Sequence, residues 1–167
     1  MRGEFVSRHL FCLRKTVANL QFTVTKALYF KEVMHYDKGN YRLSDDREDI
    51  QIDSVESLLR SSYWASERSL ETIEVSIAHS VCFSLFCGGR QVGFARVVTD
   101  FASVAYIADL IIHPNHRANG IGKWMFGVIV NDPRWHSKFQ FLATDDAHGL
   151  YEKFGFSGSN KLMSTKI

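Results

Sequence analysis

The sequence lacks any apolar run close to the roughly 18 residues that a membrane-spanning helix needs, so we expect no membrane partner. It has only 3 cysteines, without a C-x-x-C pair, which argues against a disulfide framework or a zinc site, and no metal is predicted. Internal repeats and low-complexity segments are missing as well. These absences favour a soluble, cytoplasmic protein.

The main part of the chain also lacks a basic face. The formal net charge is +2 at pH 7, but the positive excess lies in residues 1–33, and residues 34–167 hold more acidic than basic side chains. A nucleic-acid-binding domain is expected to present clustered Lys and Arg with interleaved aromatics. We therefore expect no nucleic-acid partner.

Residues 1–33 mix apolar and basic residues without a period of 2 or 3.6, and they lack the compact apolar core of a secretory signal. We interpret them as an N-terminal extension of uncertain structure, with a mitochondrial-type presequence as the alternative. Residues 34–167 have the length of one domain that buries a core without disulfides or a metal.

The pattern over residues 34–167 predicts an α+β fold with a mixed sheet. Gly88-Gly89 suits the tight turn of a hairpin, and Gly155 is predicted to cap the last helix in a left-handed conformation. The predicted elements are a strand at 41–44, helices from 53 and over 69–79, strands over 81–87, 91–99 and 104–112, a helix over 120–130, a strand over 139–144 and a helix over 147–154.

The segment Ile107–Lys123 is the most informative, because it predicts a strand, a turn and the start of a helix. Gly120 and Gly122 let the backbone approach a ligand closely, and the N–H groups of the helix's first turn can hold a pyrophosphate. Arg117 adds positive charge there. The spacing matches neither the P-loop nor the dinucleotide-binding pattern, since no third glycine follows.

Two motifs resemble those of the GNAT superfamily of N-acetyltransferases, and the chain is similar to its small bacterial-type members. Arg117-x-x-Gly120-x-Gly122 matches the R/Q-x-x-G-x-G/A signature, and Leu110 to Pro114 before it resembles motif A. Residues 147–156 resemble motif B, in which an alanine, a tyrosine four residues later and a final Gly-Phe close the last helix.

This resemblance covers residues 41–165 and implies a three-layer α/β/α fold. Its mixed, mostly antiparallel sheet would be splayed between its central strands, here 104–112 and 139–144. Acetyl-CoA would lie in that split as the co-substrate. Thr144 stands where many members carry a cofactor-binding asparagine.

The resemblance also implies which residues hold acetyl-CoA. Backbone groups at the end of the first central strand would pair with the pantetheine arm like an added strand: Leu110, Ile111 and Ile112. Amides of the following loop and helix start would hold the pyrophosphate: Arg117, Ala118, Asn119, Gly120, Ile121, Gly122 and Lys123.

Tyr151 is the implied catalytic residue, next to the thioester sulfur of the bound cofactor. A phenol is a weaker acid than a thiol by about 1.5 pKa units, so full proton transfer is uphill by roughly 2 kcal/mol. Stabilising the developing charge with a hydrogen bond is therefore an equal interpretation. A purely packing role beside Leu150 or Phe154 is the structural alternative.

Asp109 is the acidic candidate for the general base or for holding the acceptor's ammonium group, and a structural role at a strand bulge is its alternative. Tyr63 and Trp64 lie where the family builds its acceptor pocket, and they either stack on the substrate or fill the core. Tyr106 replaces a glutamate that some protein-acetylating relatives use.

The sequence thus predicts an N-acetyltransferase that places an acetyl group on a primary amine by direct attack on the thioester. A small-molecule amine is the expected acceptor, and a protein amine is the second class. The alternative is an acetyl-CoA-binding sensor or scaffold without turnover. A homodimer is left open.

Overall fold

The computed structural model describes residues 33–165, and within them a compact unit begins at Met34. The expectation for the N-terminal extension falls outside the described residues, except at Val33. The helices and strands, in chain order, are β1 (His35–Lys38), β2 (Tyr41–Ser44), α2 (Ile52–Arg60), α3 (Leu70–Ala78), β3 (Val81–Cys87), β4 (Arg90–Thr99), β5 (Val104–Ile112), α4 (Ile121–Val130), β6 (Phe139–Phe141) and α5 (His148–Tyr151).

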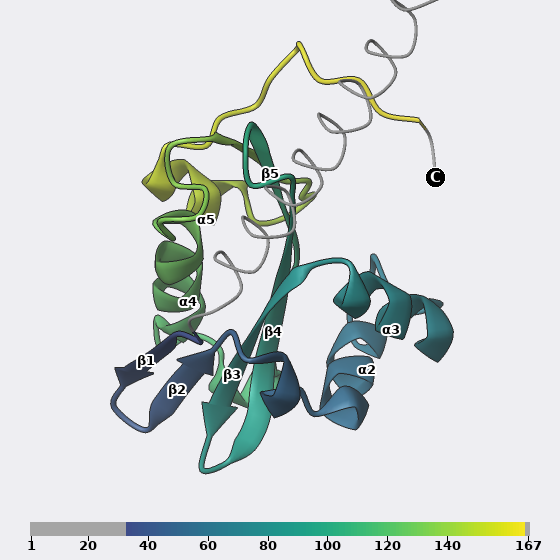
Figure 1. The fold of residues 1–167 in the computed structure, drawn as a ribbon, viewed down its shortest axis with the longest axis vertical. Coiled ribbons are helices and arrows are strands. Elements are labelled where there is room, and N and C mark those ends of the chain that lie inside the picture. The colour runs from purple at the N-terminus through teal and green to yellow at the C-terminus, as the bar shows by residue number, and fades with distance from the viewer. Residues whose placement is uncertain (1–32, 166–167) are drawn as a thin grey trace, which may run out of the picture. The chain divides into compact units, whose positions relative to one another are not determined.

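The described strands form one mixed sheet in the order β1-β2-β3-β4-β5-β6 (Figure 1). Neighbours from β1 to β5 pair antiparallel, whereas β5 and β6 pair parallel. The hairpin between β3 and β4 turns through Gly88 and Gly89, both with positive φ, as the sequence predicted. The predicted α+β class with a mostly antiparallel sheet is confirmed.

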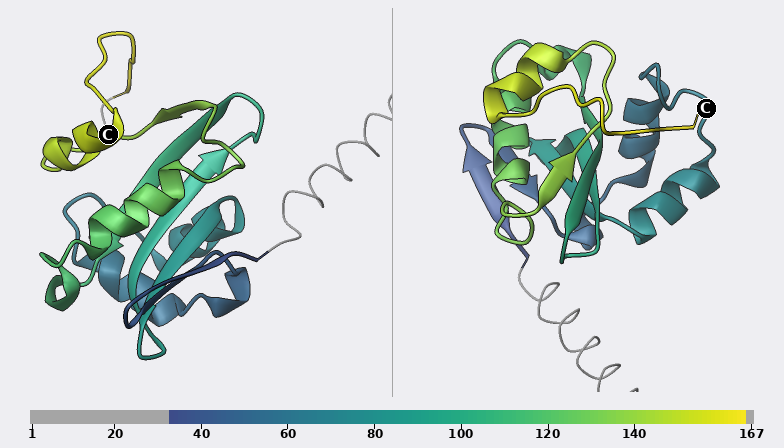
Figure 2. Two further views of the ribbon diagram at one scale, coloured as in Figure 1. Left: turned by 90° about the vertical axis from the view of Figure 1, so that its left-hand side faces the viewer. Right: turned by 90° about the horizontal axis from the view of Figure 1, so that it is seen from above.

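Helices cover both faces of the sheet, which gives the predicted three layers (Figure 2). On one face, Val55 of α2 and Ile73 of α3 are buried with Phe94 and Ile111 of the sheet. On the other face, α4 lies against a larger core, whose biggest buried side chains are Phe83, Phe126 and Trp135. Burial of each such side chain stabilises the fold by roughly 1.5–3 kcal/mol.

Local signals explain where the helices begin and end. The Ser69 hydroxyl accepts a hydrogen bond from the N–H of Thr72 at 3.2 Å and caps the start of α3. Gly120 has a φ of 79° immediately before α4. Gly155 has a φ of 83° and ends the short 3₁₀ turn Glu152–Phe154 that follows α5, so the predicted left-handed cap is confirmed.

Three details differ from the expected elements. β1 was not predicted, because its His-Tyr-Asp-Lys sequence has no apolar face and its residues are mostly exposed. The predicted strand over 139–144 ends at Phe141, since Leu142 and the residues after it leave β5. The predicted last helix is α5 followed by a separate 3₁₀ turn.

The sheet opens between β5 and β6. Parallel pairing joins only Val104 with Phe139, Ala105 with Gln140 and Tyr106 with Phe141. Beyond that point β5 keeps its pairing with β4 as far as Ile112, while its other edge has no strand partner among the described residues. The predicted splay between the central strands is confirmed, and it leaves an open backbone edge over residues 107–112.

Candidate active site

A bulge interrupts β5 at the open edge. Phe94 pairs with Ile111 and Arg96 pairs with Ala108, so two residues of β5 oppose only Ala95 on β4. The first of them, Asp109, has a φ of 55°. Aspartate visits this left-handed region more readily than most residues, and strained backbone often gathers at functional sites. The bulge places the Asp109 side chain on the α2/α3 side of the sheet.

The Asp109 carboxylate is held by two arginines. Nη1 of Arg68 and Nε of Arg96 both donate to its Oδ2, at 2.7 Å and 2.5 Å. Burial raises the pKa of the Asp109 carboxyl, but the hydrogen bond from Arg68 and the charge of Arg96 outweigh it and leave the pKa below its usual range. A carboxylate in this setting is a weak base, so the geometry favours the structural alternative for Asp109.

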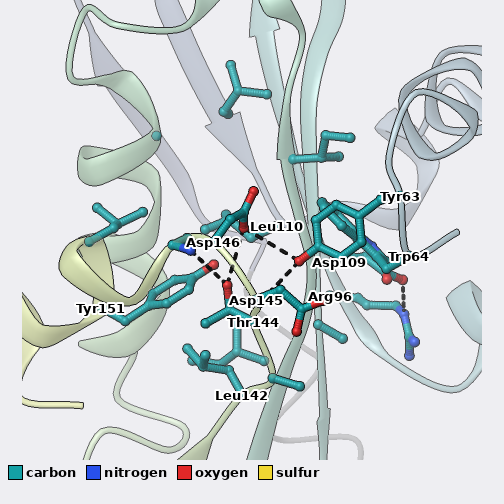
Figure 3. A pocket seen from close by; sticks show the side chains of 18 of the residues that line it. Tyr63, Trp64, Arg96, Asp109, Leu110, Leu142, Thr144, Asp145, Asp146 and Tyr151 are labelled. Atoms are coloured by element: carbon teal, nitrogen blue, oxygen red, sulfur yellow. Dashed lines mark hydrogen bonds and ion pairs between the residues drawn. The ribbon is translucent and has the colours of Figure 1, made fainter. Parts of the chain in front are cut away.

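One pocket of about 550 Å³ lies along the open edge of β5. Figure 3 shows it from close by, with the Thr144–Asp146 segment between Tyr151 and Tyr63. The pocket brings together most of the residues that the sequence singled out: Tyr63, Trp64, Asp109, Leu110, Ile111, Ile112, Arg117, Gly122, Thr144 and Tyr151.

The remaining predicted cofactor residues lie outside the pocket wall: Ala118, Asn119, Gly120, Ile121 and Lys123. The Asn119 side chain accepts from the N–H of Ile121 at 3.1 Å and donates to the Tyr41 hydroxyl at 3.0 Å. Ile121 is buried in the core. Within the first turn of α4, the amides of Gly122 and Lys123 therefore remain as donors for a phosphate.

Arg117 is tied to the end of β5. Its Nε donates to the carbonyl oxygen of Ile112 at 2.7 Å, and its own N–H donates to Pro114 at 3.1 Å. The side chain thus places a guanidinium group between the open strand edge and the start of α4. This position adds positive charge where a pyrophosphate was predicted to lie.

Tyr151 combines a packed ring with a hydroxyl that faces the pocket (Figure 3). The ring centroid lies 4.8 Å from that of Phe126, so Tyr151 packs on α4, where Phe154 also meets Phe126 at 5.0 Å. Among the described residues, the hydroxyl has no hydrogen-bond partner. Burial raises the pKa of Tyr151 above its usual value, and the negative charge of Asp146 raises it further.

Thr144 uses its side chain locally. Its hydroxyl accepts a hydrogen bond from the N–H of Ala147 at 3.0 Å, immediately before α5. This bond helps to fix the segment that leads into α5 and Tyr151. The contact between Thr144 and the cofactor stays a prediction.

Tyr63 and Trp64 form the opposite wall, between α2 and α3. Their rings meet edge to face at 4.9 Å, and they are 56% and 42% exposed, so neither fills the core. The Tyr63 hydroxyl accepts from the N–H of Asp145 at 3.2 Å and donates to the Asp146 carboxylate at 3.5 Å. Both walls of the pocket are therefore joined at this point.

Sequence reasoning missed the position of four charged side chains in the pocket wall: Arg68, Arg96, Asp145 and Asp146. Arg96 had a usable signal, because it is the only charged side chain in the otherwise apolar stretch from Val92 to Val98 of β4. Arg68 had none, since its partner Asp109 lies 41 residues away in the sequence.

A protein of this architecture is known from Xanthomonas campestris pv. campestris. That crystal structure, assigned to the GNAT family of acetyltransferases, superimposes with a TM-score of 0.73 and 33% sequence identity, over 78% of this chain and 96% of that one. The chain belongs to the GNAT family. The family model for the acetyltransferase (GNAT) domain matches residues 78–158.

Curated relatives agree with this GNAT assignment. A Gibberella zeae protein that carries an acetyltransferase name is 26% identical in an alignment of 141 residues, and the match covers 71% of this chain and 80% of the relative. The uncharacterised N-acetyltransferase ycf52 of Porphyra purpurea is 31% identical over 114 residues, 64% of this chain and 65% of the relative. GNAT acetyltransferases use acetyl-CoA. Within residues 33–165, no helix has the length and apolar character needed to cross a membrane.

Proposed function

We propose that this GNAT protein transfers an acetyl group from acetyl-CoA to the primary amine of a small molecule, by direct attack of the amine on the thioester. One observation carries the proposal: the open edge of β5, the Tyr151 hydroxyl and the Tyr63–Trp64 wall line the same pocket. A donor held along β5 and an acceptor held by the aromatic wall would meet beside Tyr151.

The residues of the pocket fit a long, flexible ligand that ends in phosphates. Backbone groups of Ile107–Ile112 are open on one side for pairing with an extended amide chain. Gly122 has no side chain at the first turn of α4, and a Cβ there would make an ordinary contact with Ile112 at 3.5 Å. A GNAT-fold protein from Clostridium acetobutylicum with 19% identity and a TM-score of 0.54 was solved with acetyl-CoA.

Bound acetyl-CoA supplies an acetyl group activated as a thioester. Tyr151 would direct its O–H to the sulfur as the C–S bond breaks, and either donate the proton or hold it in a hydrogen bond. The raised pKa of Tyr151 favours the second role, because a weaker acid keeps its proton until the negative charge on sulfur is well developed.

The acceptor must lose a proton to react. An alkylammonium near pKa 10.4 costs roughly 4 to 5 kcal/mol to deprotonate at pH 7. Asp109 is badly placed for this task, because both arginines hold its carboxylate. The exposed Asp146 carboxylate lies on the segment that leads into α5, where it accepts from the Tyr63 hydroxyl, and it can receive the proton directly or through water.

The test is an assay of thiol release from acetyl-CoA with a panel of primary amines, with the acetylated amine identified by mass spectrometry. Release that depends on the amine and yields the amide supports the proposal. A protein that is stabilised thermally by acetyl-CoA but releases no thiol with any amine would instead be the non-catalytic binding module.

A further inference from the structure

The floor of the acceptor end of the pocket holds two arginines and one carboxylate. Arg68 comes from the connection between α2 and α3, and Arg96 comes from β4. Both arginines donate to Oδ2 of Asp109, and neither of these two hydrogen bonds involves Oδ1. The three side chains are mostly buried, with 20%, 15% and 3% exposure.

The charges of this group do not balance. Two guanidinium groups face one carboxylate, which leaves one positive charge in excess. Neither arginine forms an ion pair with another acidic side chain of the described residues. Arg96 also donates to the Ser80 hydroxyl at 3.3 Å, but a hydroxyl adds no charge.

An excess charge in a half-buried place is costly unless a counter-charge offsets it. Arg68 is the more exposed of the two, and each guanidinium has five N–H donors. Only Nη1 of Arg68 is used in bonding Asp109. The remaining donors suit the planar oxygens of a carboxylate or those of a phosphate.

The wall of the pocket that faces the two arginines carries negative charge. Asp145 and Asp146 lie on the segment that leads into α5, and Tyr63 bonds to both residues from the α2/α3 side. The negative charge of Asp146 reaches Tyr151, whose pKa it raises. The acidic side chain whose charge acts on Tyr151 is therefore Asp146, and the two arginines line the same pocket.

Resting on the proposed function, we propose that the acceptor is a small amine that also carries an anionic group, a carboxylate or a phosphate. Arg68 and Arg96 receive the anionic group, and Asp146 receives the amino group beside Tyr151. An acceptor of this kind supplies the missing negative charge at the arginines and meets a matching charge at its other end. An amine without an anionic group offers a partner to Asp146 but none to Arg68 and Arg96.

Matched acceptors test this in the wild-type protein. ω-Amino acids with two to five methylene groups are compared with their primary amides, and aminoalkyl phosphates with the corresponding amino alcohols. Rates are expressed per neutral amine, so that differences in amine pKa cancel. We expect kcat/KM to be about ten- to a hundredfold higher for the anionic member of the best pair, which corresponds to a charge-assisted hydrogen bond. The two series show whether carboxylate or phosphate is preferred.

Substitution of Arg68 locates the preference. Arg68→Gln should raise KM for the anionic acceptors at least fivefold more than it raises KM for the neutral ones, and Arg68→Lys should recover part of this difference. Arg60→Gln is the matched control, because Arg60 pairs with Glu56 on the exposed face of α2 and does not line the pocket.

Equal kcat/KM for anionic and neutral members of every wild-type pair would overturn the inference while leaving the acetyltransferase proposal intact. An anionic preference that Arg68→Gln does not reduce in a folded protein would also contradict it. Thiol release with none of the amines would contradict the proposed function, and the inference with it. The wild-type pairs decide the matter even where the Arg68 variant fails to fold.

Discussion

The hydroxyl of Tyr63 accepts a hydrogen bond from the backbone N–H of Asp145 at 3.2 Å, although 82 residues separate them in the sequence. This contact joins the connection between α2 and α3 to the segment that follows β6. The two segments form the walls of the pocket where we propose that the acceptor binds, so the contact helps to set their spacing (Figure 3).

Removing this hydroxyl should loosen the acceptor end alone. For Tyr63→Phe we expect KM for the amine to rise about three- to thirtyfold, because one or two hydrogen bonds are lost. The affinity for acetyl-CoA should stay near that of the wild type. Steady-state kinetics with each substrate varied in turn measure both. A rise in KM for acetyl-CoA with no change for the amine would show that Tyr63 serves the donor side.

Tyr151→Phe should lower kcat by roughly ten- to a thousandfold, because only the hydroxyl that we propose to act on the leaving sulfur is lost. The ring keeps its contact with Phe126, and no bond within the described residues is broken, so stability should not fall. Tyr36→Phe is the matched control, since Tyr36 lies on β1 and its hydroxyl bonds to the sulfur of Met34, outside the pocket. Near-wild-type turnover of a folded Tyr151→Phe protein would leave this tyrosine a packing residue.

Gly122 tests the predicted phosphate seat. Gly122→Asp should abolish acetyl-CoA binding, because a side chain and a negative charge enter the space at the first turn of α4. Gly122→Ala should fold, since its added Cβ makes only an ordinary contact with Ile112. It should bind acetyl-CoA more weakly, because the Cβ lies at the predicted phosphate seat. Gly149→Ala is the control, with nothing within 4 Å of the added Cβ. Unchanged affinity by calorimetry in the folded Asp variant would place the cofactor elsewhere.

Asp109→Asn should destabilise the fold by about 3 kcal/mol, because two buried arginines lose their counter-charge. The lowered pKa of Asp109 sets the sign of the pH dependence. The charged Asp109 carboxylate contributes its full stabilisation above the ordinary carboxyl pKa of about 4. That stabilisation is lost as the pH falls through the lower pKa of the folded state. Urea unfolding of both proteins should therefore show a difference that is full at pH 7 and shrinks in acid. A constant difference would exclude this charge as the cause.

A chain that begins at Met34 should fold and keep its affinity for acetyl-CoA. The backbone nitrogen of Met34 donates to the Asp45 carboxylate at 2.6 Å, and a charged α-amino group can make the same contact. Thermal unfolding with and without acetyl-CoA compares this chain with the full one. Failure to fold, or loss of the ligand shift, would make residues 1–33 part of the functional domain.

The sequence predicted those parts of the fold that leave a local pattern. Apolar residues at helical spacing identified α4, and the Gly88-Gly89 pair identified the β3–β4 hairpin. β1 was not predicted, because a polar, exposed strand has no alternation of apolar and polar residues. β6 was predicted too long, since Leu142 and Ala143 look like strand residues and only their departure from β5 ends the pairing.

In the candidate site too, residues in local motifs could be predicted, and contacts between distant segments could not. Motif spacing identified Gly122 and Tyr151, which line the pocket. The partners of Asp109 could not be identified, because the contact between Arg68 and this residue depends on how the sheet and the α2/α3 connection meet. The bulge that turns Asp109 toward them is likewise a property of two paired strands and not of one segment.

The short junction between β5 and β6 has a consequence for selectivity. An unpaired strand edge ordinarily invites other chains to add themselves, and it is an aggregation hazard when it lies on the rim of a sheet. Here the bare edge of residues 107–112 lies in a slot whose far wall is formed by residues 142–147. A strand of another sheet brings its own neighbours to an edge, whereas a single extended chain of amide groups needs only its own width. The wall of residues 142–147 therefore shields this strand edge from pairing with other proteins.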